Sequence, residues 1–140
     1  MSDGMKIRRK DLEEIIHYCL DTFPEECCGL LIGKRVKEEI IVEKIKNAKN
    51  IYPYDRRVGY VVDPLDYLEA EKEAEKEGLE VVGAYHSHIG LEASPSLRDL
   101  EQAIPGYVYL IISMTRETSF RAWILEEDKK MFREEEIEVI

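Results

Sequence analysis

Two histidines and an aspartate are the residues of this chain best suited to chemistry. His86 and His88 are separated by one residue, and a Ser-x-x-Asp motif follows at Ser96 and Asp99. Two imidazoles and one carboxylate supply three protein ligands for one zinc ion. They leave the fourth tetrahedral position open for water, which is typical of catalytic rather than structural zinc. The motif therefore predicts a small zinc hydrolase with one metal ion per chain.

Each half of the motif also has a simpler interpretation. A His-x-His pair can be two surface histidines, and Ser96 with Asp99 can form a capping box at a helix start. Ser94 and Pro95, however, already supply an N-cap and a first helical residue. We therefore expect the helix to begin there and to leave the hydroxyl of Ser96 free for another use. We assign no role to His17, which lies within a predicted helix.

A hydrolase of this kind also needs a general base, and two glutamates compete for that role. Glu25 and Glu26 lie together at the start of a predicted strand, where alternation sends neighbouring side chains to opposite faces. Both could equally be solvated acids. The residue pattern alone does not choose between them.

The elements that must position these residues are those of a mixed α/β domain. Apolar spacing, together with capping and breaking residues, marks the helices, and short apolar runs mark the strands. The predicted helices are 10–22, 63–77 and 94–103, and the predicted strands are 27–33, 38–45, 59–62, 79–86, 107–114, 119–125 and 134–140. Helices alternate with strands, and hairpins are also present, which predicts a mixed β-sheet flanked by helices. The length of 140 residues predicts one domain over 1–140.

These elements can bring the motif residues together. His86 and His88 are two apart at a strand end, so their side chains point the same way. Ser96 and Asp99 are three apart in a helix and share a face. The loop 89–94 lets that helix fold back onto the strand end, so all four groups can converge on one point.

Composition and charge exclude several partners. The formal net charge of −10 would repel a phosphate backbone, so we expect no nucleic-acid partner. The sequence has no run of about 18 apolar residues that could span a membrane and no apolar signal region, so we expect a cytoplasmic protein. A charged fraction of 36% with few amide residues suggests a thermophilic source.

The three cysteines are Cys19, Cys27 and Cys28. In the cytosol we expect thiols, with disulfides only if the source is thermophilic. Adjacent Cys27 and Cys28 should point to opposite faces of a strand. The odd cysteine and the tyrosine-bearing loop 47–57 permit a homodimer without requiring one.

The spacing from His86 to Asp99 resembles the signature of the JAMM, or MPN+, metalloproteases, which remove ubiquitin and ubiquitin-like proteins from conjugates. Residues 24–33, PEECCGLLIG, resemble the segment of the family that carries the essential glutamate. Residues 81–85 and 107–113 resemble the strands on either side of the motif. Ile89 departs from the proline that the family often has there. The resemblance implies a curved sheet of the MPN, cytidine-deaminase-like architecture and a minimal archaeal or bacterial single-domain member.

The resemblance also assigns roles to the residues. It implies that His86, His88 and Asp99 bind zinc, that Glu26 is the general acid and base, and that Ser96 stabilises the oxyanion. Zinc lowers the pKa of a bound water to about 7, Glu26 would take its proton and pass it to the leaving amine, and the Ser96 hydroxyl would donate to the developing oxyanion. The substrate would enter as an extended Gly-Gly tail added to a sheet edge.

The function implied is an isopeptidase that cleaves after the C-terminal Gly-Gly of ubiquitin-like, small archaeal modifier-type proteins in conjugates. One alternative keeps the zinc hydrolase but releases amino acids or peptides from a ubiquitin-fold sulfur carrier. Another is a non-catalytic scaffold that binds ubiquitin-like proteins, although such modules usually lose ligands.

Two further enzyme classes fit less well. A nucleobase deaminase would need His-x-Glu and Pro-Cys-x-x-Cys, which this chain lacks. A cysteine protease would need Cys27 or Cys28 accessible, and both are expected to pack in a strand.

Overall fold

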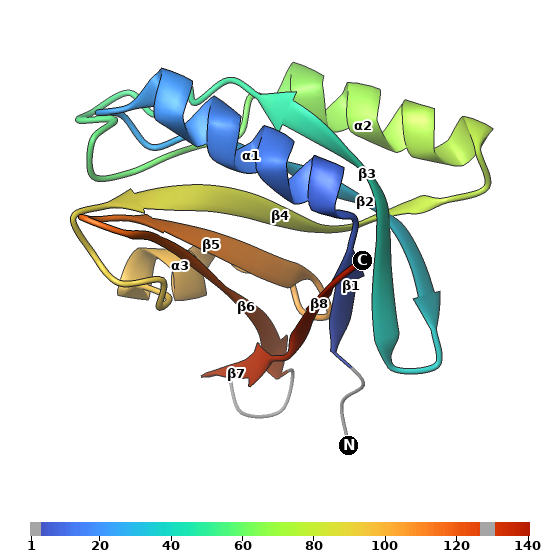
Figure 1. Ribbon diagram of the computed structural model, residues 1–140. Coiled ribbons are helices and arrows are strands. Elements are labelled where there is room, and N and C mark those ends of the chain that lie inside the picture. Colours follow the sequence, from blue (N-terminus) through green and yellow to red (C-terminus); the bar gives the residue numbers. More distant parts are fainter. Residues whose placement is uncertain (1–3, 127–130) are drawn as a thin grey trace.

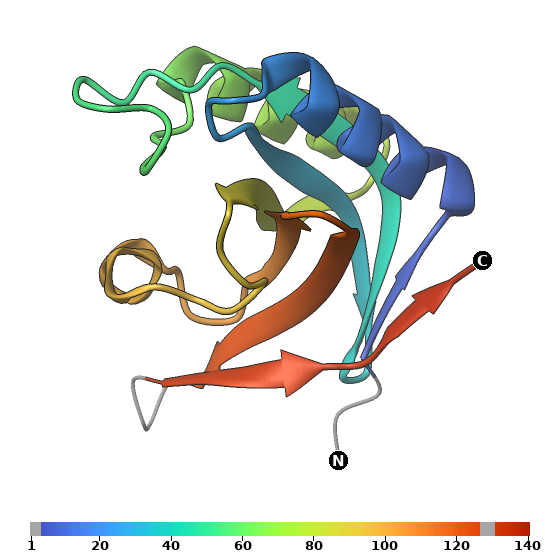
Figure 2. The same ribbon diagram turned by 60° about the vertical axis from the view of Figure 1, so that its left-hand side comes forward.

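The computed structural model describes residues 4–126 and 131–140. Within them, one curved β-sheet has the strand order β7-β6-β5-β4-β2-β3-β1-β8 (Figures 1 and 2). The strands are β1 Met5–Ile7, β2 Cys28–Val36, β3 Glu39–Ala48, β4 Glu80–Ile89, β5 Val108–Met114, β6 Thr118–Glu126, β7 Met131–Glu135 and β8 Ile137–Val139. The helices are α1 Arg9–Thr22, α2 Pro64–Lys76 and α3 Leu97–Gln102. The mixed α/β class with a curved sheet is as predicted.

The helices cover both faces of the sheet. Leu12 and Ile15 of α1 are buried in a core with Leu31 of β2 and Leu110 of β5. Ala70 and Ala74 of α2 pack in a separate core against other side chains of the same strands. In Figure 1 α1 therefore lies in front of the sheet, whereas α2 and α3 lie behind it. Helices α1 and α2 each bury the apolar positions that their spacing predicts.

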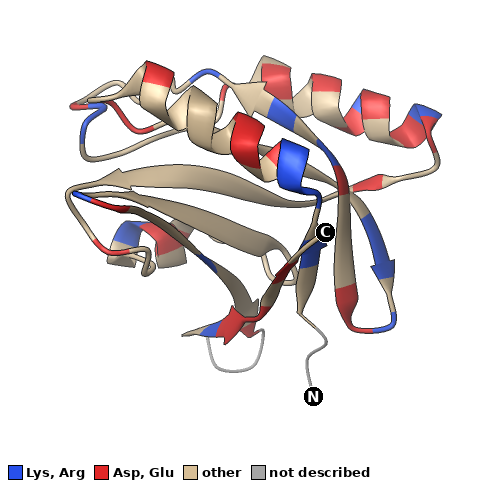
Figure 3. Cartoon of the chain, in the orientation of Figure 1, with Lys and Arg blue, Asp and Glu red and all other residues tan. Residues whose placement is uncertain are grey.

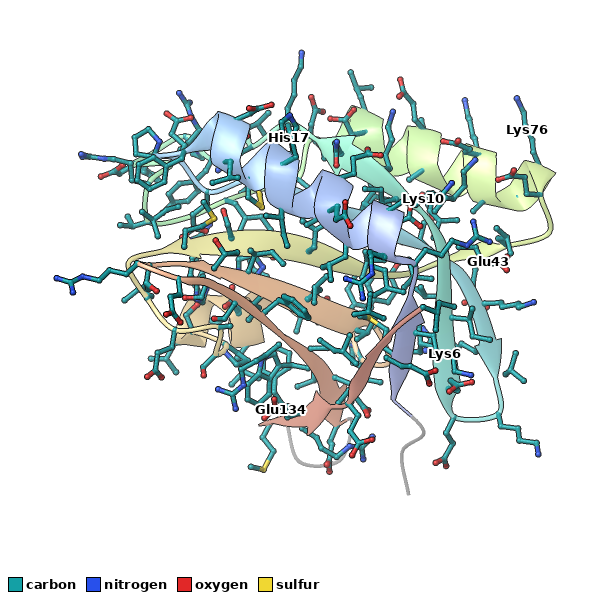
Figure 4. The ribbon with its side chains drawn as sticks, in the orientation of Figure 1. Lys6, Lys10, His17, Glu43, Lys76 and Glu134 are labelled. Carbon is teal, nitrogen blue, oxygen red and sulfur yellow. A yellow bond between two sulfur atoms is a disulfide. The ribbon has the colours of Figure 1, made fainter. Side chains whose placement is uncertain are left out.

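The outer surface of α2 is charged and solvated, as its Glu/Lys-rich sequence predicts. Lys44 of β3 forms ion pairs with Glu73 and Glu77, and Lys46 pairs with Glu69. Figure 3 shows acidic and basic residues along α2, whereas the central strands β4 and β5 are almost uncharged. Exposed pairs of this kind contribute little to stability, because both charges remain hydrated. His17 likewise points outward from α1 (Figure 4), with a 77% exposed side chain.

Strand β4 occupies the centre of the sheet and carries a β-bulge. It pairs antiparallel with β2 and parallel with β5, and its register with β2 shifts between Leu31 and Ile32. The shift leaves one extra residue in β4, so Val81 and Ala84 pack on the α2 side although they are three positions apart. A bulge changes which face the following residues point to. It therefore sends the alternate residues after Ala84 to the face covered by α2 and α3.

Several predicted boundaries are wrong. Residues 59–62 do not form a strand, and only an isolated bridge joins Val62 to Asn50. The backbone N–H of Val61 donates to the side chain of Asn50 rather than to a partner strand, which limits the pairing here. The predicted last strand 134–140 is divided into β7 and β8. Strand β1 was not predicted, because three residues carry too little pattern and its parallel partners β3 and β8 are distant in sequence.

The cysteines also depart from the expectation of three thiols. Cys19 of α1 and Cys27 form a disulfide, with their Cα atoms 5.2 Å apart, and Cys28 is a buried free thiol. The turn between α1 and β2 brings the two partners within the distance a disulfide requires. Cys27 and Cys28 do lie in different cores, which confirms that they point to opposite faces. No helix among the described residues is long and apolar enough to cross a membrane.

Candidate metal centre and active site

His86, His88 and Asp99 converge on one point of the face covered by α2 and α3. The Nε2 atoms of the two histidines are 3.1 Å apart. The carboxylate of Asp99 reaches both, with Oδ1 3.2 Å from Nε2 of His86 and Oδ2 3.3 Å from Nε2 of His88. All three side chains are at most 9% exposed. The predicted convergence of strand and helix is therefore present.

The donor atoms lie close enough together to share one metal ion. One ligand atom from each of His86, His88 and Asp99 lies within 4.8 Å of the other two, and ligand atoms bound at roughly 2.0–2.1 Å to a tetrahedral zinc lie roughly 3.3–3.4 Å from one another. The two short contacts of Asp99 use different oxygens, Oδ1 toward His86 and Oδ2 toward His88, so the carboxylate would turn to place one oxygen on the ion. Two imidazoles and one carboxylate would then leave a coordination position for water or substrate.

The two histidines are held in orientations suitable for metal binding. Nδ1 of His88 lies 2.8 Å from the carbonyl oxygen of Glu92. A carbonyl only accepts, so Nδ1 carries the proton and the lone pair is on Nε2. The ring of His86 stacks on Tyr60 with centroids 4.3 Å apart. Burial lowers the pKa of His86, which favours the neutral imidazole that a metal requires.

The start of α3 differs from the prediction. The helix begins at Leu97 with Ser96, not Ser94, as its N-cap. Ser96 and Asp99 form a reciprocal capping box, in which each side chain accepts the other's backbone N–H. Pro95 therefore precedes the helix instead of beginning it. The capping-box interpretation is therefore correct. The same carboxylate of Asp99 faces His86 and His88, so the capping box does not exclude metal binding by Asp99.

The structure also distinguishes the two candidate bases. Glu25 is exposed and pairs with Arg56 at 3.1 Å. Glu26 is only 5% exposed and borders the hollow that contains His88 and Asp99. Burial raises the pKa of its carboxyl to about 7, although the charge that His88 carries when protonated opposes the shift. A carboxyl with that pKa can exchange protons near neutral pH.

Sequence reasoning missed Asn50, which connects Glu26 to the preceding loop. Its Nδ2 donates to the carbonyl oxygens of Glu26 and Gly59, both at 3.0 Å. Its Oδ1 accepts from the backbone N–H groups of Tyr52 and Val61 at 3.0 and 3.1 Å. One side chain therefore satisfies four backbone groups beside the candidate base. The only signal in the sequence is a lone amide in a loop, which is too weak to assign a role.

The groups surround a small hollow of about 150 Å³. Glu26, Ser96 and Asp99 line it, together with Arg98 of α3. The guanidinium of Arg98 lies 4.2 Å above the ring of Tyr52, so it joins α3 to the loop that Asn50 organises. A metal site, a proton acceptor and a hydroxyl around one hollow can together activate water and polarise a carbonyl.

The mixed α/β fold and the candidate metal site beside a hollow are features of a metal-dependent hydrolase. Comparison with known proteins shows the family. Residues 8–126 match the family described as prokaryotic homologs of the JAB domain. This covers most of the chain, and the protein belongs to that family. The JAB/MPN membership agrees with the resemblance in the sequence.

Two relatives and one solved structure illustrate the similarity. The chain is 37% identical to a desampylase of Pyrococcus furiosus over 76% of this chain and 71% of the relative. It is 34% identical to a probable TtuB-protein conjugate cleaving protease of Thermus thermophilus over 86% of this chain and 75% of the relative. A protein from Desulfitobacterium hafniense, solved in solution, has a TM-score of 0.85 and 29% identity, covering 97% of this chain and 92% of that one.

Proposed function

We propose that this protein is a zinc-dependent isopeptidase that releases ubiquitin-like modifier proteins from their conjugates by cleaving after the C-terminal Gly-Gly. The observation that carries the proposal is the convergence of His86, His88 and Asp99 on one point beside the buried Glu26. The relatives named desampylase and TtuB-protein conjugate cleaving protease support hydrolysis of modifier conjugates. Zinc is favoured because two imidazoles and a carboxylate are its usual catalytic ligands.

Each residue has a defined task in this reaction. When bound by His86, His88 and Asp99, zinc would polarise the scissile carbonyl and lower the pKa of a water molecule. Glu26 holds the proton that the attacking water loses and transfers it to the leaving lysine amine. Burial raises the pKa of the Glu26 carboxyl to about 7. The carboxyl can therefore both take the proton from water and release it to the amine near neutral pH.

Ser96 is positioned to stabilise the developing oxyanion. Its Oγ accepts the backbone N–H of Asp99 at 3.0 Å, which uses a lone pair and leaves the hydroxyl proton to donate. The same hydrogen bond keeps the hydroxyl at the edge of the hollow. Asp99 thus both binds the metal and orients the proposed oxyanion donor.

The test is cleavage of a lysine-linked conjugate of a ubiquitin-like modifier by zinc-loaded protein. The parent and Glu25→Gln should release the modifier, whereas Glu26→Gln should lose about 10²–10⁴-fold in rate with its zinc content unchanged. Full activity of Glu26→Gln would show that Glu26 is not the base. Cleavage of C-terminal extensions on a sulfur carrier, without cleavage of lysine-linked conjugates, would replace the isopeptidase with the sulfur-carrier hydrolase.

A further inference from the structure

A second hollow of about 200 Å³ lies on the same face of the sheet, beside the proposed metal site. Its floor is formed by Leu30 of β2 and Ala84 of β4, and its walls include four tyrosines. These are Tyr60, Tyr67, Tyr107 and Tyr109. We call this hollow the tyrosine pocket. The site described above does not use it.

The tyrosine pocket is apolar despite its hydroxyl groups. The hydroxyls of Tyr67 and Tyr107 hydrogen-bond to each other. The hydroxyl of Tyr109 accepts the backbone N–H of Ile104 at 2.6 Å. Because three of the four hydroxyls have a hydrogen-bond partner within the protein, the walls present mainly ring faces and aliphatic carbon. Such a pocket favours an apolar group and disfavours a charge, which would lose its hydration there.

The tyrosine pocket adjoins the proposed active site. Tyr60 lines both hollows, and its ring stacks on His86. Ala84 on the floor precedes His86 by two residues on β4, and two strand residues span roughly 6.6 Å. An extended substrate that leaves the metal site parallel to β4 covers the same distance with two of its own residues.

We propose that the tyrosine pocket binds an apolar side chain of the substrate's acyl part, two residues before the residue that supplies the scissile carbonyl. In a modifier that ends in Gly-Gly, this is the residue immediately before the two glycines. The inference rests on the proposed function and adds a specificity site to it. The pocket is smaller than the roughly 300 Å³ at which sites for whole small molecules begin, so it suits a single side chain.

The leaving side of an isopeptide bond fits the tyrosine pocket less well. A lysine stem is unbranched and offers no side chain to fill a pocket. Beyond its four methylenes, the stem joins the backbone of a folded target protein, which cannot enter a hollow of about 200 Å³. The acyl side, in contrast, presents a side chain at the required distance from the scissile carbonyl.

The first test compares lysine-linked conjugates of one modifier that differ only in the residue X of an X-Gly-Gly terminus, with X as Leu, Ala or Asp. We expect kcat/KM to decrease from Leu to Ala to Asp, with at least about tenfold between Leu and Asp. Equal cleavage of all three would overturn the tyrosine pocket as a specificity site while leaving the isopeptidase intact. If no conjugate were cleaved, the proposed function would fail, and this inference with it.

The second test alters the pocket mouth without touching the metal site. Gln102 lines the pocket and is exposed at the end of α3, so Gln102→Trp should obstruct the mouth and reduce kcat/KM for the Leu conjugate to that of the Ala conjugate. Glu101→Trp, on an exposed neighbour that does not line the pocket, should keep the preference for Leu. An unchanged preference in Gln102→Trp would overturn the proposal.

Discussion

Ser96 and Asp99 hold each other across the first turn of α3. The backbone N–H of Asp99 donates to Oγ of Ser96 at 3.0 Å, and the backbone N–H of Ser96 donates to Oδ2 of Asp99 at 2.8 Å. That same Oδ2 lies 3.3 Å from Nε2 of His88. The start of the helix therefore orients the carboxylate of the proposed metal site, much as hydrogen-bonded partners orient ligands in other metal proteins.

Ser96→Gly should separate capping from catalysis. Glycine is almost as good an N-cap as serine, so we expect the free energy of unfolding to fall by only a few tenths of a kcal/mol. The lost hydroxyl should reduce kcat by about 10²–10³-fold. Urea denaturation and steady-state kinetics measure the two effects. Ser96→Ala is the control that loses both the cap and the hydroxyl, and a normal kcat in Ser96→Gly would remove Ser96 from the oxyanion role.

Asp99→Asn should lose most of the bound metal. The substitution keeps the shape of the side chain but removes the charge that faces His86 and His88. We expect the zinc content, measured by elemental analysis after dialysis, to fall from one ion per chain to a small fraction. Asp55→Asn is the matched control, because Asp55 pairs with Arg57 at the surface. A chelator should likewise abolish activity in the parent, and added zinc should restore it.

The rate of cleavage should rise with pH through the pKa of Glu26. Burial raises this pKa to about 7, and a general base acts only as the carboxylate, so the active fraction increases as the pH rises. Below the midpoint, log kcat/KM should climb by about one unit per pH unit. A bound cation favours the carboxylate and moves the midpoint below 7. A pH profile between about 5 and 8 that fell with increasing pH would contradict this assignment.

Asn50→Ala should weaken both the fold and the activity. Four hydrogen bonds of its side chain are lost, each worth about 1 kcal/mol, so we expect about 2–4 kcal/mol less stability in urea denaturation. The rate should fall because the backbone of Glu26 loses its connection to the loop. Asn50→Asp retains the acceptor but loses both donors, and its defect should be smaller than that of alanine. Equal activity in all three proteins would exclude a positioning role.

Thiol alkylation should leave the enzyme active. Cys28 is fully buried, and burial raises the pKa of its thiol to about 12, whereas a reactive cysteine needs an accessible thiolate. Cys19 and Cys27 are joined to each other. Iodoacetamide applied to the folded protein near pH 8 should therefore cause neither inhibition nor a mass increase on Cys28. Inhibition by the alkylator but not by a chelator would restore the cysteine-protease alternative.

The sequence by itself determined most of the elements and predicted the candidate metal-ligand set. His86, His88 and Asp99 are recognisable because ligand chemistry restricts the residue types and because strand and helix periodicities place spaced residues on one side. The start of α2 is a second example, because Asp63 followed by a proline is a local signal for a helix start. In the structure the side chain of Asp63 accepts the backbone N–H of Leu65. Local signals of this kind depend on neighbouring residues and are present in the sequence.

Only the tertiary structure decided which side of the sheet carries the candidate site and which glutamate borders it. A bulge near the start of β4 sets the face to which His86 and His88 point, and the bulge depends on the register with β2. Glu26, and not Glu25, borders the hollow, and its backbone carbonyl is held by Asn50, which is 24 residues away in the sequence. The tyrosine pocket unites residues from β2, β4, β5 and α2. Such relationships arise from contacts between residues distant in sequence, so no local pattern encodes them.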